Sequence, residues 1–351
     1  MLIASTHVCR AWRKIFISRP TLWEDLRSGD TEKTLTYLER SKTTPVNVTV
    51  SRYGKLFPQD SFLQVIPRTA GRLKSLSINV IPEYLNDIVP HLSTPEPLLE
   101  SLDIFIDTVE SDEVTTLPPI FGRDLPALRD LRLWYVNTEL PWRKMANLTS
   151  FSFGMVSRGE ISITQFLDFL EGASNLREVN LTFVTPTSDS QGERLVSLPS
   201  LKTMKIDAEE PCAPLLSHLS IPVGAKLEIK ARRISLSYDD YLPKSLDNLR
   251  NLSNFTMADL VFDSPDSKLQ FSGPNGELFM DLKIYQIDIG SVMLDHMARL
   301  GYSAIERLRI VGGGTPEPRV VHRVFLSMQN LRTLTLYRCE GQYALVCSLS
   351  P

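Results

Sequence analysis

A short hydrophobic frame recurs along most of this chain and constrains its fold more than any other feature. In each copy, apolar residues occupy the first, fourth and sixth positions of a hexapeptide, except in one degenerate copy that begins with glycine. Eleven copies follow one another at intervals of 20 to 29 residues. They begin at Leu73, Leu99, Leu128, Leu148, Leu176, Leu201, Gly224, Leu252, Phe279, Ile305 and Leu331. Self-similarity at such a period predicts a repeat architecture.

The frame predicts one strand in every repeat. Its fourth and sixth positions alternate with polar residues, as in a strand with one buried face. A single repeat cannot stabilise itself, because burying three frame side chains contributes roughly 5–9 kcal/mol. Ordering about 26 backbone residues costs on the order of 1–2 kcal/mol for each residue. Stacked neighbours must supply the difference, so we expect a solenoid with a continuous core.

The segments between the frames predict what covers the strands. Amphipathic segments with apolar residues at helical spacing are expected to be helices on the convex side; they are residues 61–73, 83–92, 164–176, 292–305 and 322–331. Residues 186–201 and 262–278 are rich in Pro, Ser, Asp and Gly and are expected to be loops. Residues 105–125 and 262–278 are the expected exposed excursions.

The chain ahead of the repeats predicts a small helical head. Residues 6–17 place apolar side chains on one helical face, namely Val8, Trp12, Ile15 and Phe16. Arg19-Pro20 ends this helix, and Leu22–Leu26 begins a second short element. Residues 27–44 predict a polar helix that joins the head to the array. The strict alternation of Pro45–Val50 predicts the first strand, shielding the end of the array.

Two resemblances to known families rest on these residues. The last frame, LRTLTLYRC from Leu331 to Cys339, matches the leucine-rich-repeat consensus L-x-x-L-x-L-x-x-(N/C). The head resembles the C-terminal half of an F-box, whose usual form is C-(R/K)-x-W-(R/K) followed by P-x-L-W. The matching residues are Cys9, Arg10, Trp12, Arg13, Pro20, Leu22 and Trp23. The family's Leu-Pro pair and first helix have no counterpart here, which an incomplete gene model or a fragment would explain.

The resemblances imply a fold and a function. The expected fold is an α/β leucine-rich-repeat solenoid, a horseshoe with parallel strands on the concave face and helices and loops on the convex side. Residues 1–44 would form the F-box-like head with its linker and residues 45–351 the array. In that family the F-box binds the Skp-type adaptor of a cullin–RING ubiquitin ligase, and the repeats hold a protein substrate. The alternative is a leucine-rich-repeat scaffold that binds a partner without any ligase.

The resemblance assigns adaptor binding to one set of residues, and strand geometry assigns substrate binding to another. The adaptor set is Val8, Cys9, Trp12, Arg13, Pro20, Leu22 and Trp23. The third, fifth and seventh positions of each repeat face away from the core, and aromatic residues beside arginine are common interface anchors. The partner-binding set is therefore Asp103, Phe105, Arg132, Trp134, Lys283, Tyr285, Arg309 and Tyr337.

Burial is the competing explanation for the aromatic residues in both sets. Phe105 and Trp134 are equally well explained if the loop of residues 106–125 covers them and makes a second small core. In the head, core packing is the favoured explanation for Trp12 and Trp23, because tryptophan is usually well buried.

The ninth repeat position departs from the leucine-rich-repeat pattern. It usually carries an asparagine whose side chain bonds the turning backbone, but none of the eleven copies has asparagine there. Six of the eleven have an aliphatic residue instead. We therefore expect other groups or water to satisfy the turns, and an irregular horseshoe of variable curvature.

Composition and spacing give no support for catalysis or metal binding. The five histidines (His7, His91, His218, His296 and His322) and four cysteines (Cys9, Cys212, Cys339 and Cys347) are scattered and lack zinc-site spacing. The triplet Gly312–Gly314 lacks the Lys-Ser/Thr of a phosphate loop and is expected to be a turn. No nucleophile, base and orienting group can be assembled. We expect a non-enzymatic protein without cofactor or metal.

The charge distribution and the termini predict the environment. The net charge of −3 favours neither a nucleic acid nor a membrane as partner. Residues 1–52 nevertheless carry a balance of +4, from 9 Lys/Arg and 5 Asp/Glu, and the remaining residues one of −7. A basic head that docks an acidic partner and ordinary solvated helices explain this asymmetry about equally well. Without a signal-peptide pattern or a membrane-length apolar run, we expect a cytoplasmic or nuclear location.

Overall fold

The computed structural model describes most of the chain. The described residues are 7–51, 60–107, 115–138, 145–155, 161–184, 186, 194–235, 238–263, 266–284, 300–312 and 324–338. Within them the protein is mixed α/β, with a large, mostly parallel sheet and no closed barrel. The chain forms two compact units, Met1–Ser157 and Arg158–Pro351, and the arrangement within each unit is described separately.

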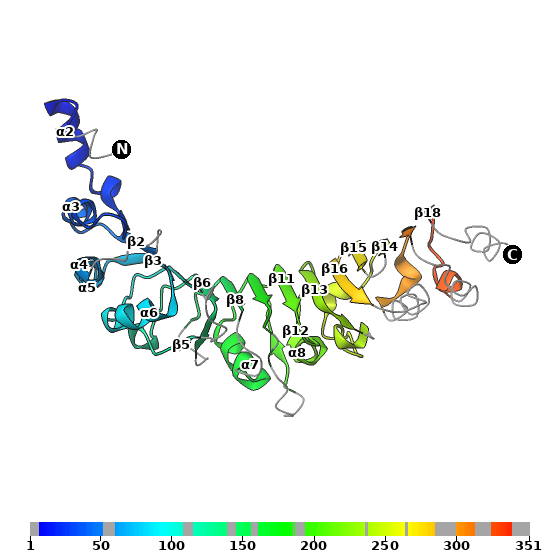
Figure 1. Cartoon of the computed structure of the whole chain (residues 1–351). Helices are drawn as coiled ribbons and strands as arrows, with labels where there is room; N and C mark the ends of the chain where they lie inside the picture. Colours follow the sequence, from blue (N-terminus) through cyan, green and yellow to red (C-terminus); the bar gives the residue numbers. More distant parts are fainter. Residues whose placement is uncertain are drawn as a thin grey trace. The chain divides into compact units, whose positions relative to one another are not determined.

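The first unit is a run of parallel strands with short helices before and between them (Figure 1). Its strands lie in the order β1 (Asp25–Arg27), β2 (Val46–Ser51), β3 (Leu73–Val80), β4 (Ser101–Ile106), β6 (Asp130–Trp134) and β8 (Ser150–Gly154). A separate pair consists of β5 (Thr115–Leu117) and β7 (Val136–Thr138). The helices are α2 (Arg10–Ile17), η1 (Pro20–Trp23), α3 (Thr31–Ser41), α4 (Asp60–Leu63), α5 (Val65–Arg68), α6 (Pro82–Ile88), η2 (Val89–Leu92) and η3 (Phe121–Arg123).

The second unit contains both parallel strands and an antiparallel insertion. Its main strands lie in the order β9 (Glu178–Thr182), β11 (Thr203–Ala208), β13 (Lys226–Ser235), β16 (Gly276–Ile284), β15 (Asp266–Gly273), β14 (Met257–Asp263), β17 (Arg307–Gly312) and β18 (Thr333–Tyr337). Two short strands, β10 (Val196–Ser197) and β12 (Leu219–Ser220), pair separately. Its helices are α7 (Ile163–Gly172), α8 (Ala213–Ser217), η4 (Tyr238–Asp240), η5 (Arg250–Leu252) and η7 (Tyr302–Ala304).

Frame residues from successive repeats oppose one another across the strands. In the first unit Leu102 opposes both Leu76 and Leu131, and all three side chains are fully buried. In the second unit Met204 opposes Val179 and Leu227 in the same way. Because side chains alternate between the faces of a strand, this register buries one face and leaves the other open. The predicted strands are thus confirmed for the frames at 73, 99, 128, 148, 176, 201, 224, 305 and 331.

Two of the predicted frames are wrong. The copy at Leu252 places Phe255 and Met257 at the core positions, but Ala258 and Leu260 are the residues that oppose Leu308 and Ile310. The copy at Phe279 places Leu282 and Ile284 at the core positions, but Leu278 and Met280 are the residues that oppose Leu227 and Ile229 of β13. Apolar spacing alone does not determine the register, and both segments offer apolar residues on neighbouring positions.

The cause of this displacement is an antiparallel meander. Strand β15 pairs antiparallel with β14 on one side and with β16 on the other. Residues 262–278 are therefore not the predicted loop. Leu269 and Phe271 of β15 are buried and alternate with the exposed Lys268 and Gln270, which is a strand period that the surrounding Pro, Ser and Gly residues obscure. The other expected excursion is described only in part, because residues 108–114 lie outside the described structure.

A left-handed residue ends several of the parallel strands. Tyr135, Met155 and Phe183 follow β6, β8 and β9 with φ between 54° and 60°, a conformation that is unfavourable for large side chains. It turns the chain so that the next residue, Val136 or Val184, is buried. The aliphatic ninth position of the repeats at 128 and 176 thus extends the core.

Asparagines before the frame, rather than at its ninth position, bond the turns. The Nδ2 of Asn147 donates to the carbonyl of Pro126 at 2.8 Å, and that of Asn330 donates to Ser303 at 2.6 Å. The buried Asn251 bonds Ala225 in the same manner. Each asparagine immediately precedes a frame leucine and bonds a carbonyl 21 to 27 residues upstream. The expectation that other groups satisfy the turns is borne out at these three positions.

In each unit helices cover one side of the strands (Figure 1). The predicted helices at residues 83–92 and 164–176 are present as α6 with η2 and as α7. Helix α7 begins with a capping box between Ser162 and Gln165 and buries Phe166 and Leu170. Of the predicted helix at residues 61–73, only the short α4 and α5 are present. Of the predicted helix at residues 322–331, residues 324–327 are helical. Most of residues 292–305 lie outside the described structure.

The head is joined to the strands through β1. The predicted linker helix is α3, capped by Asp30, which accepts from the backbone of Lys33. Residues 45–50 form β2 as expected, but β2 is not the first strand, because the short β1 precedes it and pairs with it. No described helix is long and apolar enough to cross a membrane.

Truncating a frame residue tests the buried face. Leu131→Ala should lower the free energy of unfolding by about 2–5 kcal/mol, because it leaves a cavity among fully buried side chains. Arg132→Ala, on the next residue and half-exposed, should change it by about 0.5 kcal/mol or less. Urea unfolding of both variants measures the difference. Similar losses for the two would show that β6 does not bury one face.

Candidate functional site

The open strand face is the candidate binding surface. In β4 and β6 the buried residues alternate with side chains that are exposed or half-buried. The same alternation holds in β9 and β11. Because helices lie on the other side of the strands, polar and aromatic side chains on this face remain accessible to a partner.

Four of the predicted partner-binding residues form one cluster in the first unit. Asp103 of β4 opposes Arg132 of β6, and Phe105 opposes Trp134 in the same register. The rings of Phe105 and Tyr135 meet edge to face, with their centroids 5.6 Å apart. Phe105 and Trp134 are half-buried, so the proposal that they are anchors and the proposal that a loop covers them both remain predictions. The cluster itself is a strip of aromatic and charged groups.

The charges in this cluster are only partly paired. Arg132 forms an ion pair with Asp130 on its own strand, at 3.0 Å, rather than with the opposing Asp103. Burial raises the pKa of Asp103 above its ordinary value; Arg132 acts in the opposite direction, and the nearby Asp130 adds a further small rise. Asp103 is therefore an incompletely stabilised carboxylate on the open face.

The other predicted partner-binding residues do not form a single site. Lys283 is exposed on β16, and two strands, β15 and β14, separate it from β17. Arg309 of β17 forms an ion pair with Asp259 of β14 at 2.7 Å. Tyr337 of β18 is exposed, and the guanidinium of Arg338 lies 5.2 Å from its ring centroid. Tyr285 lies outside the described residues.

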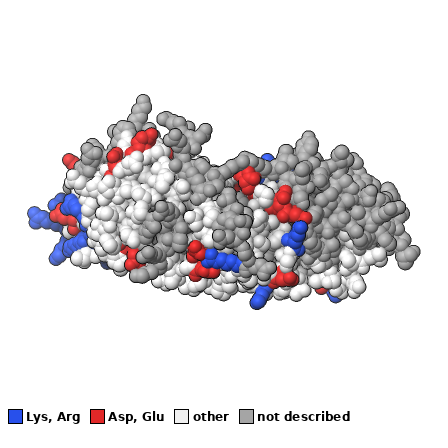
Figure 2. Space-filling view, turned by 90° about the horizontal axis from the view of Figure 1, so that it is seen from below, with Lys and Arg blue, Asp and Glu red and all other residues white. Residues whose placement is uncertain are grey.

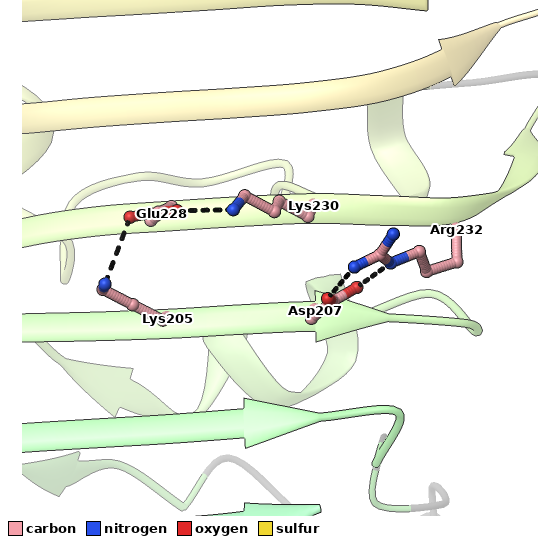
Figure 3. A network of polar contacts seen from close by, with 5 residues as sticks. All are labelled: Lys205, Asp207, Glu228, Lys230 and Arg232. Carbon is pink, nitrogen blue, oxygen red and sulfur yellow. Dashed lines mark hydrogen bonds and ion pairs between the residues drawn. The ribbon is translucent and has the colours of Figure 1, made fainter. Parts of the chain in front are cut away.

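Five charged residues of β11 and β13 form a plate that the sequence did not single out as a site (Figure 3). Glu228 accepts from Lys230 at 3.1 Å and lies 3.8 Å from Lys205 on the neighbouring strand. Asp207 and Arg232 form a bidentate pair at 2.6 and 2.7 Å. The hydrogen bonds to Asp207 raise the pKa of Arg232. We call Lys205, Asp207, Glu228, Lys230 and Arg232 the charged plate.

Phe279 lies beside the charged plate. It was assigned to the core by the displaced frame, but it alternates with the buried Leu278 and Met280 and is itself half-buried. The register places it opposite Glu228 of β13 and Gln270 of β15. Reading residues 276–284 as a strand whose buried residues are Leu278, Met280 and Leu282 would have found it, since a shift of one residue exchanges the two faces.

The head presents a second candidate surface on α2. Val8, Trp12 and Ile15 are exposed, and no residue of α2 is buried. The expectation that Trp12 belongs to the core is wrong. The Trp12 and Phe16 rings lie 6.0 Å apart on one side of the helix, so the apolar face predicted from the spacing exists but has no covering element among the described residues. An exposed apolar face of this kind is suited to binding a partner protein.

Trp23 fixes the end of α2 to the body of the head. Its indole Nε1 donates to the carbonyl of Phe16 at 2.9 Å, its ring meets Tyr37 edge to face at 5.0 Å, and the Arg40 guanidinium lies 4.5 Å from its centroid. It is fully buried, as expected for a core residue. Of the remaining predicted adaptor residues, Cys9 and Arg13 are exposed, whereas Pro20 and Leu22 are half-buried.

Basic side chains accompany the apolar residues of α2. Arg10, Arg13 and Lys14 all lie on this helix and are exposed. The space-filling view shows lysine and arginine gathered at the end of the first unit that carries α2 (Figure 2). A partner for this helix therefore needs an apolar groove bordered by acidic groups.

The described residues contain no group of three or more metal-ligating side chains. Cys212 is buried, and burial raises the pKa of its thiol to about 12, so it stays protonated and unreactive. The Nδ1 of His218 lies 2.8 Å from the carbonyl of Arg194, in a contact within the fold. His296, His322, Cys339 and Cys347 lie outside the described residues.

The raised pKa of Asp103 predicts how stability depends on pH. Because the folded state holds this proton more tightly than the unfolded state, the contribution of Asp103 to stability should fall as the pH rises above about 4. Asp103→Asn removes this loss, so the variant should be more stable than the parent at pH 7, with a gain that shrinks at lower pH. Thermal unfolding across this range measures it, with Asp130→Asn as the control that breaks an ion pair. A variant less stable than the parent at pH 7 would contradict the assignment.

Comparison of the chain with family models, with curated proteins and with solved structures finds no match. Function must therefore be inferred from the two surfaces that the structure presents. One is the exposed apolar and basic face of α2, and the other is the open face of the strands.

Proposed function

We propose that this chain is the F-box-type substrate-recognition subunit of a Skp–cullin–RING ubiquitin ligase, without catalytic activity of its own. In this proposal α2 and η1 dock the Skp-type adaptor. The open strand face holds a protein substrate for ubiquitin transfer. Such a complex works in the cytoplasm or the nucleus, which is where we place the protein.

The exposed face of α2 is the observation that carries the proposal. A helix with Trp12 and Ile15 in solvent exposes apolar area that would be worth about 1.5–3 kcal/mol for each large side chain if it were covered. The buried Trp23 holds the end of this helix against α3, so the face is presented by a fixed support. Both tryptophans also belong to the F-box-like pattern of the sequence.

We further propose that the strands form an irregular leucine-rich-repeat solenoid. Three repeated features support this: the opposed frame residues, the left-handed residue after several strands, and the asparagine that bonds the preceding turn. The meander of β14, β15 and β16 is then an insertion in the repeat pattern. An array of this kind offers a long, nearly continuous face to a protein partner.

Removing the apolar side chains of α2 tests adaptor binding. Trp12→Ala with Ile15→Ala should weaken capture of a purified Skp-type adaptor by about tenfold or more, because central aromatic anchors dominate interface energy. The unfolding free energy should change little, since neither side chain is buried. Glu39→Ala, on the exposed side of α3, is the matched control. Surface-plasmon resonance and urea unfolding give the two measurements.

The same experiment separates the ligase proposal from the scaffold without a ligase. If the adaptor binds neither this chain nor a version extended upstream by a complete F-box, the ligase proposal fails. Partner capture by the strand face would then stand alone as the function. Equal binding by the double variant and its control would show that α2 is not the docking element.

A further inference from the structure

The charged plate is layered, with its carboxylates beneath its cations. The Glu228 and Asp207 side chains are only 14% and 16% exposed, whereas Lys205, Lys230 and Arg232 are 53%, 42% and 52% exposed. The longer lysine and arginine side chains rise above the shorter acidic ones and keep their charged ends in water. A partner that approaches this part of the face meets positive charge first.

The ion pairs of the plate do not neutralise it. Glu228 forms ion pairs with both Lys205 and Lys230, and Asp207 forms one with Arg232, so three cations share two carboxylates. One positive charge is therefore in excess within the plate. Asp281 of β16, opposite Lys230, adds a carboxylate to this part of the face, and the exposed Lys268 of β15, opposite Asp281, adds a further cation. Exposed ion pairs of this kind contribute little to stability, so the cationic ends can turn to a partner's carboxylates at small cost.

Phe279 gives the plate an apolar border. It lies on β16 directly opposite Glu228, between Glu277 and Asp281 of the same strand face. On the other side of the plate, the Arg232 guanidinium lies 5.3 Å from the ring centroid of Phe183. Aromatic groups next to partly desolvated charges are typical of the centre of protein interfaces.

We propose that the β11–β13–β16 face binds an acidic segment of a protein partner, whose carboxylates meet Lys205, Lys230 and Arg232 and whose apolar side chain packs on Phe279. This deepens the proposed function, since it names the chemistry of the segment that the strand face would hold. A nucleic acid fits less well, because the plate's own carboxylates and the net charge of −3 oppose a dense row of phosphates.

Charge-matched peptides test the inference on the full chain. The probe is a fluorescein-labelled dodecapeptide of repeated Glu-Leu-Glu-Gly, and its twin carries lysine in place of glutamate. The acidic peptide should bind, with affinity falling as salt is added, and the basic twin should bind far more weakly. Lys205→Gln with Lys230→Gln should weaken acidic-peptide binding roughly three- to tenfold, as expected for two charged contacts.

Two further variants separate recognition from folding and from net charge. Lys202→Gln with Lys244→Gln removes the same charge from exposed positions outside the plate and should leave the binding unchanged. Glu228→Gln removes a carboxylate from the plate and should strengthen binding of the acidic peptide, a gain that a purely structural ion pair would not give. Equal effects of the two lysine pairs, or weaker binding by Glu228→Gln, would overturn the inference.

The remaining outcomes distinguish this inference from the proposal on which it rests. Tighter binding of an oligouridine of equal length, or of the basic twin, would overturn the acidic-segment assignment. The plate variants should still capture the Skp-type adaptor, because α2 is unchanged. If the parent chain binds the acidic peptide but not the adaptor, the ligase assignment alone is overturned. If it binds the adaptor but not the acidic peptide, only the present inference is overturned.

Discussion

The opposition of frame side chains across parallel strands is the constraint on which the rest of the structure depends. Leu76, Leu102, Leu131 and Phe151 lie in one register row, and each is fully buried. No single repeat buries enough apolar surface to offset the entropy of ordering its own backbone. Stability therefore arises between neighbours, and it requires every strand to present the same face to the helices.

This constraint also determines where binding can occur. Once the fourth and sixth positions are buried, the third, fifth and seventh positions must face the other way. Polar and aromatic residues at those positions do not contribute to the frame core and are free to vary with the partner. The Asp103 cluster and four residues of the charged plate lie at such positions, whereas Arg232 is at a ninth position. None of them is needed to bury the frame.

The turns show how an irregular repeat satisfies its backbone. The sequence lacks asparagine at the ninth position, yet Asn147, Asn251 and Asn330 perform a comparable task from the residue before the frame. The left-handed conformation of Tyr135 and Phe183 moves an aliphatic residue inward at the position that usually carries the asparagine. These asparagines precede the frames at 148, 252 and 331, whereas Tyr135 and Phe183 end the strands of the frames at 128 and 176.

The sequence predicted strands correctly where the same apolar frame recurs in neighbouring repeats. It failed where antiparallel pairing between strands sets the register. In the first unit, β2, the four strands that carry frames (β3, β4, β6 and β8) and the buried Trp23 were predictable from spacing and residue type, whereas β1, β5 and β7 were not. The meander was not, because its strand β15 lies among turn-forming residues and its partners are set by antiparallel pairing. Phe279 was assigned to the wrong face for that reason. Trp12 was expected in the core, but its exposure depends on which elements pack on α2, which no local pattern specifies.

A thiol-accessibility scan through β6 and β11 tests the two-faced strands most directly. In a chain whose own cysteines are replaced by serine, single cysteines are placed in turn at each position of the two strands, and their labelling rates are measured under native conditions. Cysteines at 130, 132 and 134 and at 203, 205 and 207 should label rapidly, whereas those at 131, 133, 204 and 206 should label only as the protein unfolds. Rates that vary with a period of three to four residues, or not at all, would contradict the alternating strand face and the binding surfaces built on it.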